Sequence, residues 1–387
     1  MRHEEPRASH LFGLALLLVA AVGFVIALAS AAGRARTSRS PHLPAAFLDD
    51  AESLASRDLA RLRDEGFTRV VIDLSPLGVP VRSDDRGAID SSAAIAVRAA
   101  IAGAEDAGLA VDYWIEVGRD PAAAASNAAW LHRPHKTIFF GGEPVAVAEW
   151  VCINNKEVFD YEVEKVARIL EAAPRGVARR VFLNDVLGAP EGCGCGNAFC
   201  RMWDGSIGEK IALGGGEGAF GGDPVAPILF AEAIEERFPG LTAVPVITEE
   251  CEAGVAHAGV ADAETTLGYG RMLCTHPDAL ESYPRLIHLL AARPAVGLLA
   301  LDRTFGRDDP AFGAPGAWVG AMLDRYREYD SDQELWVVVE GWDLGMASVR
   351  DRVRAAEAHG AAGAIVTGKP IDQSWTVVPI RDIGATL

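Results

Sequence analysis

The body of this 387-residue chain has no basic cluster, and its acidic residues outnumber its basic ones. It contains 54 Asp and Glu residues against 36 Lys and Arg, which gives a formal net charge of −18. A surface this acidic repels a phosphate backbone, so we expect no nucleic-acid partner. The sequence also lacks a nucleophile elbow, a P-loop and a zinc-protease motif, which argues against the reactions that those motifs mark.

One long uncharged apolar run is present, at Leu11–Gly33. At about 1.5 Å per residue, a helix of this length crosses a hydrocarbon core of about 30 Å. We therefore expect a single membrane anchor over residues 11–33, with a flank at 1–10 before it and a linker at 34–55 after it. A cleaved secretory signal ending at Ala29–Ala31 is the alternative.

Two arguments about the orientation of the body relative to the membrane disagree. Arginines lie on both sides of the apolar run, and their positive-inside count leans toward a cytoplasmic body. A secretory signal would instead place the body outside the cytoplasm. We expect an extracytoplasmic body, attached to the membrane or, if the signal is cleaved, secreted.

The remaining residues, 56–387, alternate apolar strand-like runs with Ala-rich helical stretches. Continuous apolar strands joined by helices predict a parallel sheet covered on both faces. Seven firm strands and a weaker eighth near residue 270 favour an α/β fold, a (β/α)8 TIM-like barrel, over a doubly wound open sheet. The seven strand-like runs are 67–76, 109–118, 179–186, 241–250, 295–306, 334–343 and 361–368.

Several of these strands end in a carboxylate, and this repetition favours the barrel. In a barrel the C-terminal ends of all the strands meet at one mouth, where active sites lie. In an open sheet the same acids would spread along an edge. The acids concerned are Asp73, Glu116, Asp185, Glu249, Glu250, Asp302 and Glu340.

A helix, a strand and a cysteine group follow one another in the middle of the chain. The run "NNKEVFDYEVEKVARILEAA" predicts an amphipathic helix with Asn154 in the cap position and Glu157 three residues later. "RRVFLNDV" predicts a strand that ends at Asp185, and "EGCGCGNAFC" places Cys193, Cys195 and Cys200 within eight positions.

Residues 151–203 resemble a group of bacterial glycoside-hydrolase-like TIM-barrel proteins. In that group a Cys-Pro-Asn-x-Pro-type stretch opens a helix, a strand ending in Asp follows, and a Cys-x-Cys-x-x-Cys cluster comes next. This chain departs from the pattern at Ile153, where the group has Pro, and in a longer last cysteine gap. The resemblance implies a barrel mouth that faces a sugar. The matching residues are Asn154, Asn155, Asp185, Cys193, Cys195 and Cys200.

Glycoside hydrolysis requires two carboxyl groups across the scissile bond. We expect Glu340 to be the ionised member, because it ends a well-defined strand and Trp342 beside it offers an aromatic face to a sugar ring. Glu250 and Asp185 compete for the role of the acid. Glu249 and Glu250 point to opposite sides of their strand, so only one of them faces the mouth.

The site is expected to bind carbohydrate and to need no cofactor. We therefore predict a membrane-anchored glycoside-hydrolase-like protein that acts on a polysaccharide or glycoconjugate. A non-catalytic carbohydrate-binding or envelope scaffold protein on the same barrel is the alternative. The predicted substrate-binding residues are Trp342, Asp73, Glu116, Asn155, Asp302 and Tyr269.

The cysteine group is expected to cross-link a loop beside the mouth. Cys193, Cys195 and Cys200 can hold one tetrahedral Zn²⁺ if a fourth ligand is added, and Cys152 is the leading choice for it. Disulfides are the alternative, since the chain has an even number of cysteines, six. A nucleophilic cysteine is disfavoured because no histidine lies close in the sequence.

Overall fold

The computed structural model describes most of the chain from residue 45 onward. The described residues are 45–78, 91–132, 145–153, 155–184, 186, 226–248, 293–300, 316–329, 333–371 and 377–379. The chain divides into two compact units, Met1–His42 and Leu43–Leu387. All of the first unit, including the expected anchor at 11–33, lies outside the described residues. No helix within the described ranges is long and apolar enough to cross a membrane.

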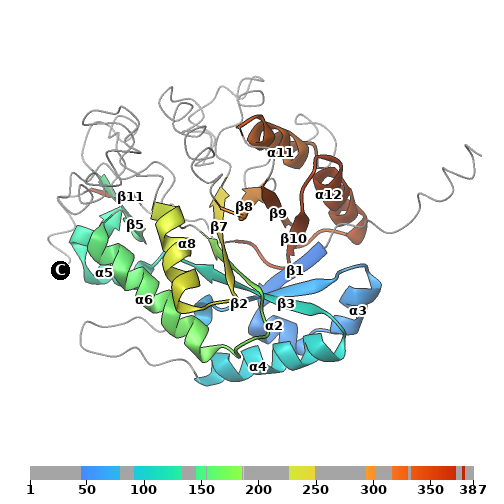
Figure 1. The fold of residues 1–387 in the computed structure, drawn as a ribbon, viewed down its shortest axis with the longest axis horizontal. Helices are drawn as coiled ribbons and strands as arrows, with labels where there is room; N and C mark the ends of the chain where they lie inside the picture. The colour runs from blue at the N-terminus through green and yellow to red at the C-terminus, as the bar shows by residue number, and fades with distance from the viewer. Residues whose placement is uncertain are drawn as a thin grey trace, which may run out of the picture. The chain divides into compact units, whose positions relative to one another are not determined.

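Eight parallel strands close into a barrel, in the order β1-β10-β9-β8-β7-β6-β3-β2 (Figure 1). This confirms the predicted TIM-like α/β barrel. The strands are β1 (Ala45–Asp50), β2 (Arg69–Asp73), β3 (Ala110–Glu116), β6 (Arg180–Asn184), β7 (Thr242–Thr248), β8 (Ala295–Ala300), β9 (Glu334–Glu340) and β10 (Gly363–Thr367).

All seven firmly predicted strands are barrel strands, but the eighth is not the one expected. The ring is completed by β1, which pairs with β10 and β2. β1 lies inside the segment 34–55 that we expected to be a linker, so the barrel begins before residue 56. The weaker candidate near residue 270 lies outside the described residues.

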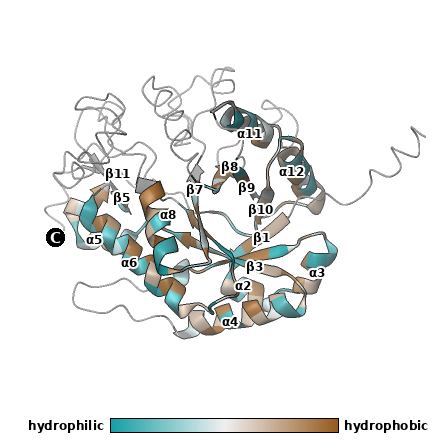
Figure 2. Ribbon diagram, in the orientation of Figure 1, coloured by the Kyte–Doolittle hydropathy of each residue, from teal (hydrophilic) through white to brown (hydrophobic). Residues whose placement is uncertain are grey.

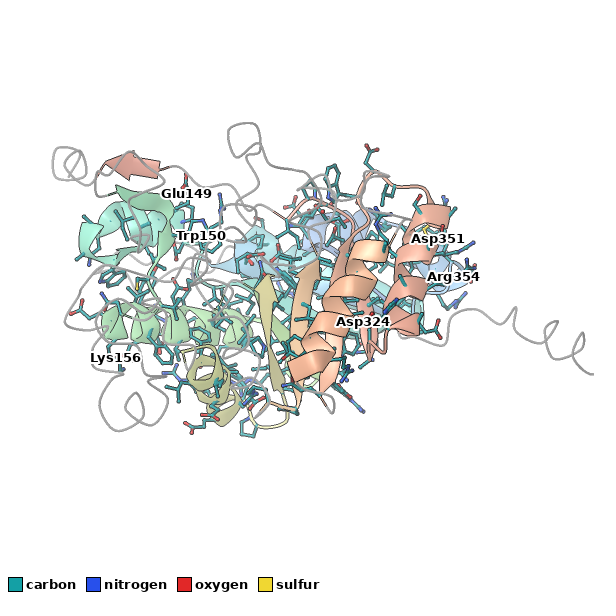
Figure 3. The ribbon with its side chains drawn as sticks, turned by 90° about the horizontal axis from the view of Figure 1, so that it is seen from above. Glu149, Trp150, Lys156, Asp324, Asp351 and Arg354 are labelled. Carbon is teal, nitrogen blue, oxygen red and sulfur yellow. The ribbon has the colours of Figure 1, made fainter. Side chains whose placement is uncertain are left out.

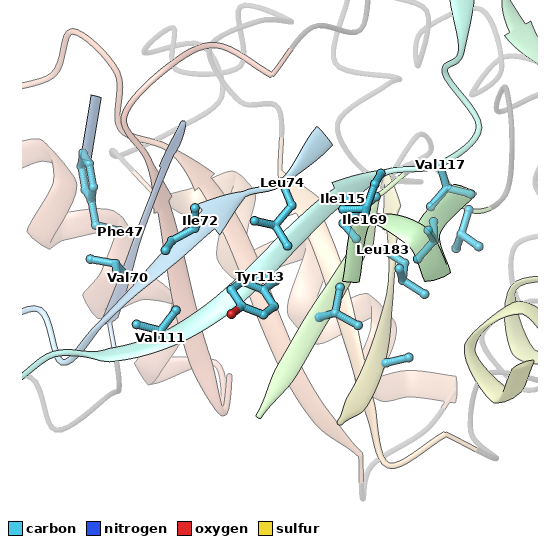
Figure 4. Packing of buried hydrophobic residues seen from close by; sticks show 14 of the residues in the cluster. Phe47, Val70, Ile72, Leu74, Val111, Tyr113, Ile115, Val117, Ile169 and Leu183 are labelled. Atoms are coloured by element: carbon cyan, nitrogen blue, oxygen red, sulfur yellow. The ribbon is translucent and has the colours of Figure 1, made fainter. Parts of the chain in front are cut away.

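Alternate residues of each strand face opposite sides of the barrel wall. One buried cluster lies inside the ring and includes Val71, Trp114, Phe182, Trp336 and Val338. The other packs the outer face of the strands against the helices. Figure 4 shows part of this outer packing, which includes Ile72, Tyr113, Ile115 and Leu183 of the strands and Ile169 of α6 (Lys156–Ala172).

Helices cover the outside of the ring (Figures 1 and 2). Their apolar residues face the strands, and charged residues such as Asp351 and Arg354 of α12 (Met346–Ala358) lie on the outside in Figure 3. The helices not yet given are α2 (Ala51–Ser56), α3 (Leu59–Asp64), α4 (Ser91–Asp106), α8 (Ala226–Arg237) and α11 (Ala317–Tyr329).

A small antiparallel sheet, in the order β11-β5-β4, is separate from the sheet that forms the barrel. Its strands are β4 (Leu131–His132), β5 (Val145–Val151) and β11 (Val377–Pro379), and the short helix α5 (Pro121–Ser126) precedes it. The end of β5 contacts the chain just after β3, because the Val151 N–H donates to the Gly118 carbonyl at 3.0 Å. The sequence patterns did not predict this sheet.

The long helix after the small sheet begins one residue later than expected. Its N-cap is Asn155 rather than Asn154, and the Asn155 side chain accepts a hydrogen bond from the Glu157 N–H at 2.9 Å. A short polar side chain at this position satisfies one of the free N–H groups of the first turn. Asn154 itself lies outside the described residues.

The N-terminal end of the barrel interior is closed by charged residues around Trp336. Asp112 forms ion pairs with Arg69 and, at 4.0 Å, with Arg180, and Arg180 pairs with Glu334 at 3.5 Å. The Arg180 guanidinium lies over the Trp336 ring, 4.7 Å from its centroid. A Cβ on Gly363 would lie 2.3 Å from Cζ3 of Trp336, so only glycine leaves room for this ring.

Candidate functional site

The C-terminal end of the barrel presents an inward-facing set of polar side chains. Trp114, Phe182 and Val338 lie in the interior cluster. Residues two positions later, Glu116, Asn184 and Glu340, therefore face the same interior at the ends of β3, β6 and β9. By the same alternation, Asp50, Asp73 and Thr367 face inward at the ends of β1, β2 and β10. We call this set, together with Trp342 and Lys369, the mouth.

Glu340 is the most enclosed carboxylate of the mouth. Its exposed fraction is 0%. The indole N–H of Trp342 donates to Oε1 of Glu340 at 3.2 Å, so the aromatic residue predicted beside this acid does contact it. Thr367 lies next to it as its register partner on β10, and the Thr367 Oγ1 accepts a hydrogen bond from the Gly341 N–H at 3.4 Å.

Glu116 is held by donors on both carboxylate oxygens. The indole N–H of Trp114 donates to Oε1 at 2.7 Å, and the Asn184 side-chain amide donates to Oε2 at 2.7 Å. Asn184 is also the register partner of Glu116 on the neighbouring strand. β3 lies opposite β9 in the ring order, so Glu116 and Glu340 end strands on opposite sides of the mouth.

Asp73 forms an ion pair with a lysine from the far end of the chain. The Lys369 ammonium donates to Oδ2 of Asp73 at 2.9 Å. The other oxygen, Oδ1, accepts the Ser75 hydroxyl at 2.6 Å and the Ser75 N–H at 2.9 Å. Ser75 in turn accepts a hydrogen bond from the Glu116 N–H at 2.9 Å, which connects the ends of β2 and β3.

The two acids at the end of β1 have different environments. Burial raises the pKa of Asp49, although Arg57 pairs with it at 3.1 Å. Burial also opposes ionisation of Asp50, but the Ser53 N–H and hydroxyl donate to it and hold its pKa below the usual range. Asp50 thus caps α2 in addition to facing the mouth.

Burial opposes the charge of Lys369, but its pKa is raised because three carboxylates surround it. Asp73 contributes most to this rise, followed by Asp50 and Asp49. The ammonium therefore stays protonated at neutral pH, and the mouth holds a fixed positive charge on the side of β10, β1 and β2.

Two further predicted site residues are buried. Asn155 is 1% exposed and caps α6. Cys152, predicted as the fourth zinc ligand, is 2% exposed. No group of three or more His, Cys, Asp or Glu side chains that could hold a metal ion occurs among the described residues.

Of the predicted site residues, the structure places four at the mouth: Trp342, Asp73, Glu116 and Glu340. The others, apart from Asn155 and Cys152, lie outside the described residues. The predicted residues outside the described ranges are Asp185, Glu250, Asp302, Tyr269, Cys193, Cys195 and Cys200.

Four polar residues of the mouth were not predicted: Asp50, Asn184, Thr367 and Lys369. Ser75, which binds Asp73, was not predicted either. Asn184, Thr367, Lys369 and Ser75 end or follow a predicted strand, and this position is the signal by which they could be found, whereas Asp50 ends β1, a strand that was itself not predicted. Only the closed ring shows which of them meet, because Lys369 and Asp73 are 296 positions apart.

No family model and no curated protein matches this chain. Among solved structures, it is similar to the Ignisphaera aggregans GH53 catalytic domain, with 12% identity, coverage of 86% of each chain and a TM-score of 0.45. A GH5_18 variant from Streptomyces cattleya in complex with Manb1-4GlcNAc gives 11% identity, coverage of 82% of this chain and 65% of that chain, and a TM-score of 0.46. A 2-naphthoyl-CoA reductase gives 13% identity, coverage of 84% and 47%, and a TM-score of 0.45.

The described residues define a parallel (β/α)8-barrel protein with a carboxylate-lined C-terminal mouth. Barrels of this class host unrelated reactions. What the mouth does must therefore be argued from its own side chains.

Proposed function

We propose that the chain is a glycoside-hydrolase-like protein that acts on a polysaccharide or glycoconjugate at the barrel mouth. One observation carries the proposal. Glu340 faces the interior at the end of β9 and accepts the indole N–H of Trp342 at 3.2 Å. A carboxylate that a neighbouring indole orients at the C-terminal end of a barrel strand is suited to act on a bound sugar.

In this proposal Glu340 is the ionised carboxylate, which acts as nucleophile or as base. The acid comes from Asp185, the residue after the last residue of β6, or from Glu250, two residues after the end of β7. The separation of the two carboxyl groups decides the outcome, about 5–5.5 Å for retention and about 6.5–9.5 Å for inversion.

Glu116 has a binding role in the same proposal. Its carboxylate orientation is set by Trp114 and Asn184, each at 2.7 Å. A carboxylate oxygen can accept a further hydrogen bond from a sugar hydroxyl, since each oxygen has two lone pairs. Trp342, which is half-buried, supplies an apolar ring face on the opposite side of the mouth, beside Glu340.

The test compares Glu340→Gln with the wild type on a panel of polysaccharides and aryl glycosides. The variant keeps the volume of the side chain and removes its charge, so we expect turnover to fall by about 10²-fold to 10⁴-fold while the urea midpoint changes little. Glu334→Gln is the matched control, because Glu334 begins the same strand at the opposite end of the barrel. Full turnover in Glu340→Gln would remove this residue from the mechanism.

A non-catalytic carbohydrate-binding protein is the second candidate, and one observation favours it. Asp73 is held in an ion pair with Lys369, and both oxygens of Glu116 already accept hydrogen bonds. Acids held in this way serve recognition rather than proton transfer. Glycan binding by the wild type without release of reducing ends, and equal binding by Glu340→Gln, would establish this second candidate.

We propose that residues 11–33 attach the protein to a membrane, that its body lies outside the cytoplasm, and that catalysis needs no cofactor. Resistance of the full chain to alkaline extraction from membranes tests the attachment, and protease accessibility in spheroplasts tests the orientation.

We propose that Cys193, Cys195 and Cys200 cross-link a loop beside the mouth, either by binding zinc or by forming disulfides. Metal analysis and thiol titration of the purified chain distinguish them.

A further inference from the structure

The main chain places Lys369 over the mouth. β10 ends at Thr367, and the next residue, Gly368, donates its N–H to the Leu48 carbonyl of β1 at 2.7 Å. A Cβ at Gly368 would lie 2.5 Å from Oδ2 of Asp49 and 2.5 Å from Cζ of Phe47, so only glycine allows the chain to pass here. Lys369 therefore starts from an anchored backbone, unlike a surface lysine on a free loop.

The Lys369 ammonium supplies the positive charge for an acidic part of the mouth. Asp49 has its own cation, Arg57, and Asp50 accepts two hydrogen bonds from Ser53. Asp73 accepts only neutral donors from Ser75, so among the described residues Lys369 is the cation that balances it.

A series of short hydrogen bonds joins Lys369 to Glu116. The Lys369 ammonium donates to Asp73 at 2.9 Å, the Ser75 hydroxyl donates to Asp73 at 2.6 Å, and the Glu116 N–H donates to the Ser75 hydroxyl oxygen at 2.9 Å. The Glu116 carboxylate then accepts the Trp114 indole N–H at 2.7 Å. Removal of the first donor leaves Asp73 with an unbalanced charge beside Asp50, its register partner on β1.

We propose that Lys369 is a positioning residue of the mouth, which fixes the Asp73 carboxylate and, through the Ser75 hydroxyl, the main chain and carboxylate of Glu116. The effect of Lys369 on a bound glycan rests on the proposed function. The effect of Lys369 on Glu116 does not, because the indole N–H of Trp114 reports on that carboxylate directly.

The experiment uses the full chain in mild detergent, labelled with ¹⁵N at the tryptophan indoles. The Trp114→Phe variant assigns the Trp114 indole resonance. We expect Lys369→Met to shift this resonance and Lys369→Arg to leave it close to the wild-type position, since arginine retains the charge and a donor. Arg57→Met is the control, because it removes the cation of the neighbouring acid Asp49.

A second measurement separates the ammonium from the fold. In Lys369→Ala, n-propylammonium should return the Trp114 resonance toward its wild-type position, whereas tetramethylammonium, which cannot donate a hydrogen bond, should not. An unmoved Trp114 resonance in Lys369→Met, or an equal shift in Arg57→Met, would overturn the proposal.

Activity provides an independent readout. If the wild type hydrolyses a glycan, Lys369→Met should lower kcat/KM by about 10-fold to 100-fold, because a small misplacement of a binding group has effects of this size. Lys369→Arg should recover most of the loss. A wild type without turnover would overturn the proposed hydrolysis, and the indole resonance would still decide the role of Lys369.

Discussion

The two ends of the barrel interior use charge in different ways. At the N-terminal end, two arginines and two acids, Arg69, Arg180, Asp112 and Glu334, pair with one another around Trp336. At the C-terminal end, Asp73 pairs with Lys369, and Glu116 and Glu340 each accept a hydrogen bond from a tryptophan indole. Ion pairs close the first end, whereas neutral donors hold two of the acids at the second end.

Burial explains why the N-terminal end must be balanced. Asp112 is 0% exposed, and burial raises its pKa although Arg69 and Arg180 oppose the rise. Removing one partner from a buried ion pair leaves the other charge without compensation, which costs more than the pair contributes. We therefore expect the two ends to respond oppositely to substitution, with stability lost at one end and function lost at the other.

The largest expected effect on stability is at Asp112. Asp112→Ala removes the anion that Arg69 and Arg180 share and leaves Arg180 with only the exposed Glu334, so we expect the free energy of unfolding to fall by about 3–5 kcal/mol. Urea unfolding followed by circular dichroism measures this change. A loss below about 1 kcal/mol, the range of exposed pairs, would contradict the view that this end is closed by charge.

The next effect concerns the space beside Trp336. Gly363→Ala places a methyl group 2.3 Å from Cζ3 of the indole, so either the ring or β10 must move. Overpacking of this kind costs about 1–3 kcal/mol. Gly345→Ala is the matched control, because a Cβ there meets nothing within 4 Å. Equal urea midpoints for the two variants would show that Trp336 is not tightly enclosed.

A third prediction concerns a buried triad outside the barrel interior. Glu162 is 0% exposed and lies 2.5 Å from Lys165, which also pairs with Asp120 at 2.8 Å. Burial raises the pKa of Glu162 from 4.5 to about 8, against the attraction of Lys165. The triad joins α6 to the N-terminus of α5, which Asp120 caps.

The sign of the resulting pH dependence follows from this raised pKa. Below pH 4.5 both the folded and the unfolded states keep the Glu162 proton, so its contribution to stability is fully present. As the pH rises to about 8, the unfolded state loses the proton first and the free energy of unfolding falls. Glu162→Gln should flatten this decline in urea unfolding between pH 5 and pH 8. An unchanged decline would assign it to other groups.

The smallest effect is expected on the outer face of the helices. Asp351 and Arg354 form a pair at 3.4 Å, and their side chains are 50% and 62% exposed. Asp351→Ala should change the free energy of unfolding by no more than about 0.5 kcal/mol, because solvent screens such pairs. A loss comparable to that in Asp112→Ala would remove the distinction between enclosed and exposed charge.

The strands of the barrel were largely predictable, because short continuous apolar runs between helices typically form buried parallel strands. β1 was the exception. Its sequence, "AAFLDD", is short, ends in two acids and follows a proline, so it resembles the end of a linker. Its burial becomes evident only when β10, more than 300 residues later in the chain, pairs with it.

The site was predictable one strand at a time and not as an assembly. Strand alternation and the barrel geometry identify Asp73, Glu116 and Glu340 as mouth residues. The pairing of Asp73 with Lys369 and of Glu116 with Asn184 depends on the order of strands in the ring, which no local pattern contains. The Trp114 ring is 1% exposed, and its N–H orients Glu116.

The central claim is that the mouth acts on a glycan through Glu340, and one paired measurement tests it most directly. Glycan turnover and urea unfolding are measured on the same preparation of Glu340→Gln. The account predicts that turnover falls by about 10²-fold or more while the free energy of unfolding falls by no more than about 1 kcal/mol. Turnover equal to that of the wild type, or a loss of activity that only follows a loss of folded protein, would contradict it.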